Sequence, residues 1–135
     1  MKIKKNHLIL LLNVISKIKK ISLSDARIRD VVIKQLIEHS QQLEKDRIVI
    51  LEKFSEKDKD GNSKKRQEHG NEVYDIPEKN LEKISKEMTI LFDEYVEIIS
   101  DTAKLKVLVE KTEYIPEFGE VEIIDDIFDN HKKKK

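Results

Sequence analysis

The sequence contains no cysteine and no tryptophan, and only three glycines and two prolines among its 135 residues. The absence of cysteine excludes disulfide bonds, thiolate metal ligands and cysteine nucleophiles from this sequence, and it is typical of proteins in a reducing compartment. Aromatic residues make up only 5% of the sequence, whereas charged residues make up 40%. This composition favours long solvated helices over a β-sandwich or a β-barrel, so we expect one mainly helical domain.

A net charge is also missing, because 27 Lys and Arg residues balance 27 Asp and Glu residues. No overall field therefore draws the protein onto nucleic acid or an anionic membrane. The basic clusters at residues 17–20, 64–66 and 132–135 are small and contain no aromatic side chains that could stack on bases. We expect no specific nucleic-acid partner.

Long apolar runs are absent, and no run approaches the roughly 20 residues of a membrane-spanning helix. The apolar stretch at residues 8–15 follows a basic start, as in a signal peptide. However, Asn13 interrupts the stretch, and it leads into Lys17 instead of a small-residue cleavage site. We therefore expect neither secretion nor membrane insertion, and we predict a cytoplasmic protein.

Hydrophobic periodicity predicts two long helices. Residues 25 to about 56 carry apolar side chains at helical spacing after a Ser24 cap, and they contain neither glycine nor proline. Residues 77 to about 94 repeat the pattern. We expect these helices to lie antiparallel, with the core at the seam between them.

Shorter elements surround this predicted pair. A helix is expected at 7–20, and a last one is expected where Val121, Ile124 and Phe128 share a helical face. The alternating residues after Asp93 favour a break into one short strand, followed by a new helix start at Ser100 and Asp101. We predict that the helical domain covers residues 1–131, with a polar loop or hairpin at 57–72 and a disordered basic tail at 132–135.

The stretch EKDKDGNSKKRQ, residues 56–67, resembles a calcium-binding EF-hand loop. Its acidic residues and its glycine fit the first, third, fifth and sixth positions of that loop: Glu56, Asp58, Asp60 and Gly61. However, Gln67 stands where a bidentate glutamate is required, and residues 64–66 add three positive charges. We expect a polar turn at Gly61 and no metal site.

Catalytic patterns are lacking. The sequence has no phosphate-binding glycine loop and no serine–histidine arrangement in a recognisable context. The four histidines lie in four separate segments, without the close spacing of a zinc site: His7, His39, His69 and His131. We therefore predict a protein that is not an enzyme and that needs no cofactor.

One charge pattern stands out, because no Lys or Arg occurs between Thr112 and His131. The candidate partner-binding residues in this segment are Glu117, Glu120, Glu122, Asp125, Asp126 and Asp129. An acidic segment that also contains isoleucine, valine and phenylalanine can dock onto a basic protein surface. The alternative is a solvated helix face that the adjacent lysines neutralise.

Four stretches within residues 6 to about 124 have a familiar pattern of charges and leucines: NHL, DARIRDVVIKQL, LEKDRIVILEKFSEKDKDGN and YDIPEKNLEKISKEMTILFDEYVEI. Together they resemble a family of small, uncharacterised proteins encoded by phages and prophages of low-GC Gram-positive bacteria. The resemblance implies a viral or prophage origin, a soluble and mainly helical fold, and a life inside an infected or lysogenic bacterial cell. It carries over no functional residues.

Two functional hypotheses follow. The first is a non-catalytic accessory protein that binds a host or phage protein, and inhibits or redirects a host factor such as an anti-phage defence protein. The alternative is a virion-assembly or tail-associated structural protein or chaperone, which would use surplus apolar residues on the long helices to bind another chain or itself. Those residues are Ile33, Ile37, Ile48 and Val49.

Overall fold

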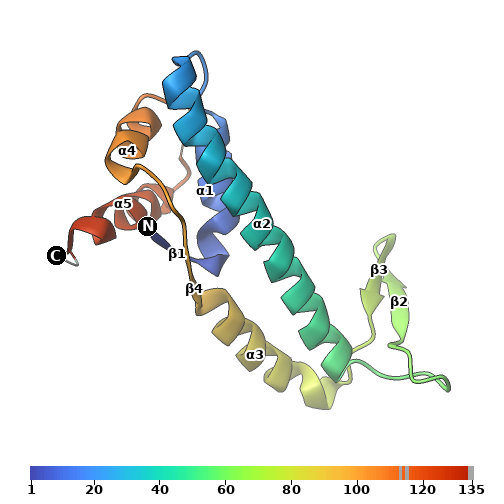
Figure 1. Ribbon diagram of the computed structural model, residues 1–135. Helices are drawn as coiled ribbons and strands as arrows, with labels where there is room; N and C mark the ends of the chain where they lie inside the picture. The colour runs from blue at the N-terminus through green and yellow to red at the C-terminus, as the bar shows by residue number, and fades with distance from the viewer. Residues whose placement is uncertain (113, 115, 134–135) are drawn as a thin grey trace. The chain divides into compact units, whose positions relative to one another are not determined.

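The computed structural model describes residues 1–112, 114 and 116–133, with side chains described as far as Phe128 (Figure 1). The described part of the chain is mainly helical, as the composition predicts. Its α-helices are α1 (Leu8–Ser16), α2 (Leu23–Phe54), α3 (Leu81–Asp93), α4 (Thr102–Glu110) and α5 (Glu120–Lys133). Two 3-10 turns, Lys5–His7 and Glu78–Asn80, directly precede α1 and α3.

The sequence predicts one short β element, whereas the described residues form four short strands in two antiparallel sheets. The strand β1 (Lys2–Lys4) pairs with β4 (Tyr95–Glu97), and β2 (Lys65–Glu68) pairs with β3 (Asn71–Tyr74). The predicted strand after Asp93 is therefore confirmed as β4, and the predicted hairpin between the long helices is formed by β2 and β3.

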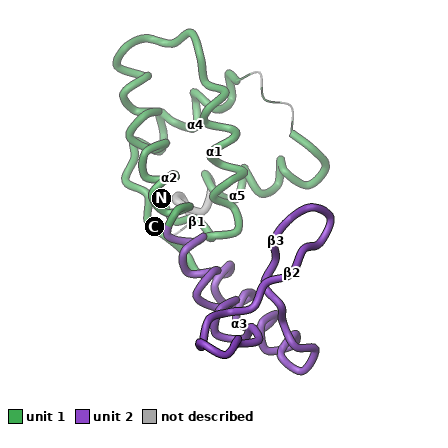
Figure 2. Tube along the Cα trace, turned by 90° about the vertical axis from the view of Figure 1, so that its right-hand side faces the viewer, with its two compact units in different colours: residues 1–41, 94–135 green, residues 42–93 purple. Residues whose placement is uncertain are grey.

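The chain forms two compact units, which Figure 2 distinguishes by colour. Unit 1 contains residues 1–41 and 94–135, and unit 2 contains residues 42–93. Helix α2 crosses the boundary between residues 41 and 42 without a break. Its continuity agrees with the absence of glycine and proline from residues 23–54.

Most of the buried core lies in unit 1. Helix α1 is the most apolar helix, and its side chains at helical spacing are buried: Leu8, Leu11, Val14 and Ile15. They share this core with buried residues from six other segments: Ile3, Ile18, Val32, Leu36, Ile98, Leu105, Leu108, Ile127 and Phe128. Each such side chain stabilises the fold by about 1.5 to 3 kcal/mol relative to an exposed one.

Strand pairing draws the first residues of the chain into this core. Ile3 lies opposite Val96 in the β1–β4 register. The backbone N–H of Lys5 also donates to the carbonyl of Glu94 at 2.8 Å, while the Lys5 ammonium group pairs with the Glu94 carboxylate at 2.8 Å. These contacts join segments about ninety residues apart, which local sequence patterns do not reveal.

Helix starts follow capping chemistry, with one difference from the prediction. The Asp101 carboxylate accepts a hydrogen bond from the N–H of Lys104 at 3.2 Å, which confirms the predicted start of α4. At α2 the cap is Ser22, because its hydroxyl oxygen accepts from the N–H of Asp25 at 3.2 Å. Ser24, the predicted cap, lies inside the helix.

Unit 2 contains the C-terminal part of α2, the β2–β3 hairpin and α3. The hairpin turns at His69 and Gly70, which both have positive φ, 51° and 80°. Two consecutive positive φ values match the twist of a two-residue hairpin turn. Asn80 donates from its side-chain amide to the Phe54 carbonyl at 2.9 Å, so it joins the start of α3 to the end of α2.

The prediction of a core at the seam between two long helices is wrong. Of the buried apolar residues, only Leu43 and Leu91 belong to unit 2. Helix α3 has 13 residues, and its Leu81 and Ile90 are exposed. The core forms in unit 1 instead, because α1 offers a more continuous apolar surface than α3 does.

The end of α5 overlaps the predicted disordered tail. The helix includes residues 132 and 133. Residues 134 and 135, the remainder of that tail, lie outside the described residues.

Candidate functional site

The acidic candidates lie in and just before α5, in unit 1. A turn at residues 117–119 precedes the helix, and Gly119 has a φ of 88°, a conformation that side chains with a Cβ rarely adopt. The turn leads directly into Glu120, the first residue of α5.

The Glu120 carboxylate forms hydrogen bonds at the start of α5. Its Oε1 accepts from the Glu117 N–H at 2.6 Å and from the Tyr114 hydroxyl at 2.8 Å. The hydrogen bond to Glu120, together with burial, raises the pKa of Tyr114. A carboxylate that satisfies a backbone donor at a helix start stabilises the helix. Glu120 is therefore a structural residue more than a free binding group.

Three other acidic residues share the solvent face of α5. Glu122, Asp125 and Asp126 are all exposed, and their spacing of three and four residues places them on one side of the helix. Ile127 and Phe128 on the opposite side are buried in the core. Asp129, the last sequence candidate, lies outside the residues whose side chains are described.

Two apolar residues next to this acidic face are exposed. Phe118 has a relative exposure of 107%, so essentially none of its ring is covered. Val121 is 53% exposed, although the sequence pattern assigns it to the core face. Val121 shares a helical face with Phe128 but lies two turns earlier, in the first turn of α5, where that face is exposed. Phe118 was missed, and the signal that could have found it is the following Gly119, which marks a surface turn.

We name these exposed residues the acidic–apolar surface: Glu117, Phe118, Val121, Glu122, Asp125 and Asp126. Glu122 and Asp125 form no ion pair with any residue whose side chain is described. The surface therefore combines uncompensated negative charge with an exposed aromatic ring.

Asp126 lies at the edge of this surface, beside a small cavity of about 170 Å³. The cavity is lined by Lys2, Ile3, Lys4, His7, Tyr95, Ile123, Asp126 and Ile127. Burial, supported by the charge of Lys4, lowers the pKa of His7 below its ordinary value of 6.5, and the charge of Asp126 opposes this shift. Because positive groups surround it, Asp126 is less available to a partner than Glu122 and Asp125.

The EF-hand-like loop forms a turn that uses its own carboxylate. The Asp58 Oδ1 accepts from the N–H groups of Asp60 at 2.9 Å and Asn62 at 3.0 Å. Gly61 supplies the positive φ of 82° that the turn requires. Among the residues that the structure describes, no three His, Asp or Glu side chains are grouped so as to hold a metal ion. Within the same residues, no helix has the length and apolar character to cross a membrane.

No protein-family model, curated protein or solved structure matches this chain. The resemblance to phage and prophage proteins stays a prediction.

Proposed function

We propose that the protein is a non-catalytic accessory protein of phage or prophage origin that binds a basic surface of a bacterial host protein and inhibits or redirects it. The observation that carries this proposal is the full exposure of Phe118, which lies in the sequence between two exposed acidic residues, Glu117 and Glu122. The resemblance to phage and prophage proteins supports the biological setting, and the acidic–apolar surface supports the mode of action.

The two halves of this surface have different physical roles. Burial of one phenylalanine side chain is worth about 1.5 to 3 kcal/mol, and aromatic anchors dominate the energetics of many interfaces. Exposed carboxylates contribute less affinity, because solvent screens them, but they steer a basic partner and exclude acidic ones. Phe118 therefore serves as the anchor, while Glu122 and Asp125 select the partner and accelerate its association.

The hydrogen bonds and exposure of the acidic residues indicate which substitutions change binding without changing folding. A change at Glu120 would remove the hydrogen bonds that start α5, so it would confuse folding with binding. Glu122 and Asp125 are exposed and form no ion pair with the described side chains, so reversing their charge costs only the interaction of Glu122 with the helix dipole in the first turn of α5, about 1 kcal/mol or less. Phe118 makes no buried contact, so Phe118→Ala removes only the anchor.

The test is affinity purification of the tagged protein from bacterial cells with and without phage infection, followed by mass spectrometry. We expect one host protein in both cultures, and we expect its recovery to fall about tenfold or more for Phe118→Ala and for Glu122→Lys with Asp125→Lys. Matched controls are Leu23→Ala and Glu38→Lys, an exposed apolar and an exposed acidic residue of α2. Equal recovery with all variants would contradict the proposal.

A virion-assembly, tail-associated or chaperone function is the second candidate, and exposed apolar residues of unit 2 favour it. Val49, Leu81 and Ile90 are each more than half exposed. Of the four surplus residues in the sequence, Ile37 and Val49 are exposed, whereas Ile33 and Ile48 are half-buried. Phage structural proteins recovered only after infection would support this function in place of the first.

A further inference from the structure

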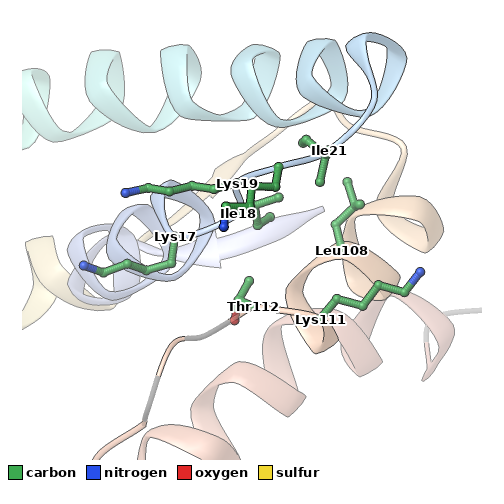
Figure 3. A pocket seen from close by; sticks show the side chains of 8 residues that line it. Lys17, Ile18, Lys19, Ile21, Leu108, Lys111 and Thr112 are labelled. Carbon is green, nitrogen blue, oxygen red and sulfur yellow. The ribbon is translucent and has the colours of Figure 1, made fainter.

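Unit 1 carries a second distinctive feature, a cavity of about 260 Å³ beside the α1–α2 connection and the C-terminal end of α4 (Figure 3). We name it the lysine cavity. Its lining residues are Lys17, Ile18, Lys19, Lys20, Ile21, Leu108, Lys111 and Thr112. All of them belong to unit 1, as does the acidic–apolar surface.

The charge of this cavity is uncompensated. All four lysines are exposed, and none of their ammonium groups pairs with a carboxylate of the described residues. Lys17 and Lys111 directly follow α1 and α4, where the negative ends of the helix dipoles favour a positive charge. Lys19 and Lys20 lie in the connection between α1 and α2, away from both helix ends. An acidic ligand would neutralise these exposed positive charges.

The directions of the side chains indicate the shape of the ligand. In Figure 3, Lys17 and Lys19 extend in one direction and Lys111 extends in the opposite direction. The apolar part of the cavity consists of Ile18, Ile21 and Leu108. A compact anion such as phosphate needs converging ammonium groups, which this arrangement does not supply. A segment with an apolar centre and acidic residues before and after it matches the cavity better.

The chain itself presents such a segment at residues 117–122, with the sequence EFGEVE. The Phe118 ring is fully exposed, and in the sequence the exposed Glu117 precedes it and the exposed Glu122 follows it. An apolar cavity of about 150 Å³ can hold benzene, so the lysine cavity has room for a phenyl ring. The exposure of Phe118 also shows that it does not occupy the cavity of its own chain.

We infer that the lysine cavity binds Phe118 and its flanking glutamates from a second copy of this chain. Because one patch binds a different patch, the interface is heterologous, and the contact propagates head to tail into rings or chains. This inference depends on the proposed function only in that both use the acidic–apolar surface. Self-association covers that surface, so a host partner competes with the second copy.

Sedimentation equilibrium of the purified full-length protein over a range of concentrations tests the inference. We expect concentration-dependent association that weakens as salt increases, because salt screens the lysine–glutamate pairs. A monomer at every concentration would overturn the inference, as would association that is insensitive to the variants described below.

Two variants separate the two sides of the interface. The cavity variant combines Lys19→Glu with Lys111→Gln, which avoids a negative charge at the end of α4. The segment variant combines Phe118→Ala with Glu122→Lys. We expect each to weaken the association constant by about 10- to 100-fold, while an equimolar mixture forms 1:1 dimers through the one intact cavity and the one intact segment. A mixture without dimers would contradict a heterologous contact.

Controls separate folding and host binding from self-association. Circular dichroism checks that each variant is helical, and Lys34→Glu with Lys83→Glu changes two exposed lysines outside the cavity. The cavity variant keeps the acidic–apolar surface intact, so it should still recover the host protein. Loss of self-association with retained host binding supports the inference. If the wild-type protein self-associates but recovers no host protein, only the proposed function fails.

Discussion

The side-chain amide of Gln35 forms two hydrogen bonds with the backbone of Ile99. The Gln35 Nε2 donates to the Ile99 carbonyl at 2.8 Å, and the Ile99 N–H donates to the Gln35 Oε1 at 2.8 Å. These bonds connect α2 to the residues between β4 and α4. One side chain therefore satisfies both backbone groups of Ile99, where no further strand is paired with them.

Replacement of Gln35 by alanine should lower the free energy of unfolding by about 1 to 2 kcal/mol, because its two hydrogen bonds to Ile99 and one to the Val31 carbonyl are lost at a partly solvated site. Urea denaturation followed by circular dichroism measures this change. Gln41→Ala is the matched control, because Gln41 is an exposed residue of the same helix. Equal stability of the two variants would show that the Gln35 bonds contribute nothing.

Core truncation in α1 should be far more costly than truncation at an exposed leucine. Leu11 is 0% exposed and Leu23 is 68% exposed. Leu11→Ala should lower the free energy of unfolding by about 2 to 5 kcal/mol, because it leaves a cavity in a packed core. Leu23→Ala should change it by less than about 0.5 kcal/mol. Similar losses in the two variants would place the core elsewhere.

Acid should destabilise the fold partly through His7. Its folded pKa is lowered from 6.5, mainly by burial, so the unfolded chain binds more protons in the interval between the two pKa values. The contribution of His7 to the free energy of unfolding is therefore fully present above about pH 6.5, where His7 is neutral in both states. It is lost as the pH falls through the pKa of His7 in the folded protein. Denaturation at about pH 8 and about pH 5 should show a smaller acid loss for His7→Gln than for the wild type.

Asp126 should modulate the same titration. Its negative charge favours protonated His7, so Asp126→Asn should lower the pKa of His7 further. Nuclear magnetic resonance titration of the His7 ring measures the shift, and Asp125→Asn is the matched control on the same exposed helix face. A pKa that rises or stays constant in Asp126→Asn would contradict the arrangement of these two side chains.

Calcium should leave the EF-hand-like loop unchanged. The Asp58 carboxylate already accepts two backbone hydrogen bonds, and Lys64 with its two basic neighbours adds repulsion. The melting temperature should be the same with and without millimolar calcium. Asp58→Ala should instead increase the hydrogen exchange of the Asp60 and Asn62 amides, because their acceptor is removed. A calcium-dependent rise in melting temperature would indicate a metal site that this loop geometry does not show.

The elements that could be predicted from the sequence are those that interactions between neighbouring residues determine. The continuity of α2, the Asp101 cap and the break before Tyr95 depend on neighbouring residues, and each is found in the structure. Strand β1 was missed, because three residues become a strand only through pairing with β4. The predicted position of the core was also wrong, because that position depends on which segments, distant in the sequence, pack against one another.

The candidate site also combines features that neighbouring residues determine with features that distant contacts determine. The sequence placed Glu122, Asp125 and Asp126 in an acidic segment, and the structure brings them to one exposed helix face. It could not show that Glu120 is used at the helix start, because that depends on a hydrogen bond with Tyr114. The exposure of Phe118 depends equally on tertiary packing. Periodicity gives the relative directions of side chains along a helix, but the rotation of the helix is set by the core.

The β2–β3 hairpin offers a practical point of attachment. All four residues of β2 are exposed, and the space where Gly70 would carry a side chain is open. A short epitope or a fluorophore inserted between residues 69 and 70 would meet no packed neighbour. Because the hairpin belongs to unit 2, such a label leaves the helix face of α5 and the four lysines chemically unaltered. Capture and labelling experiments can therefore be done with every residue of both surfaces kept in its native form.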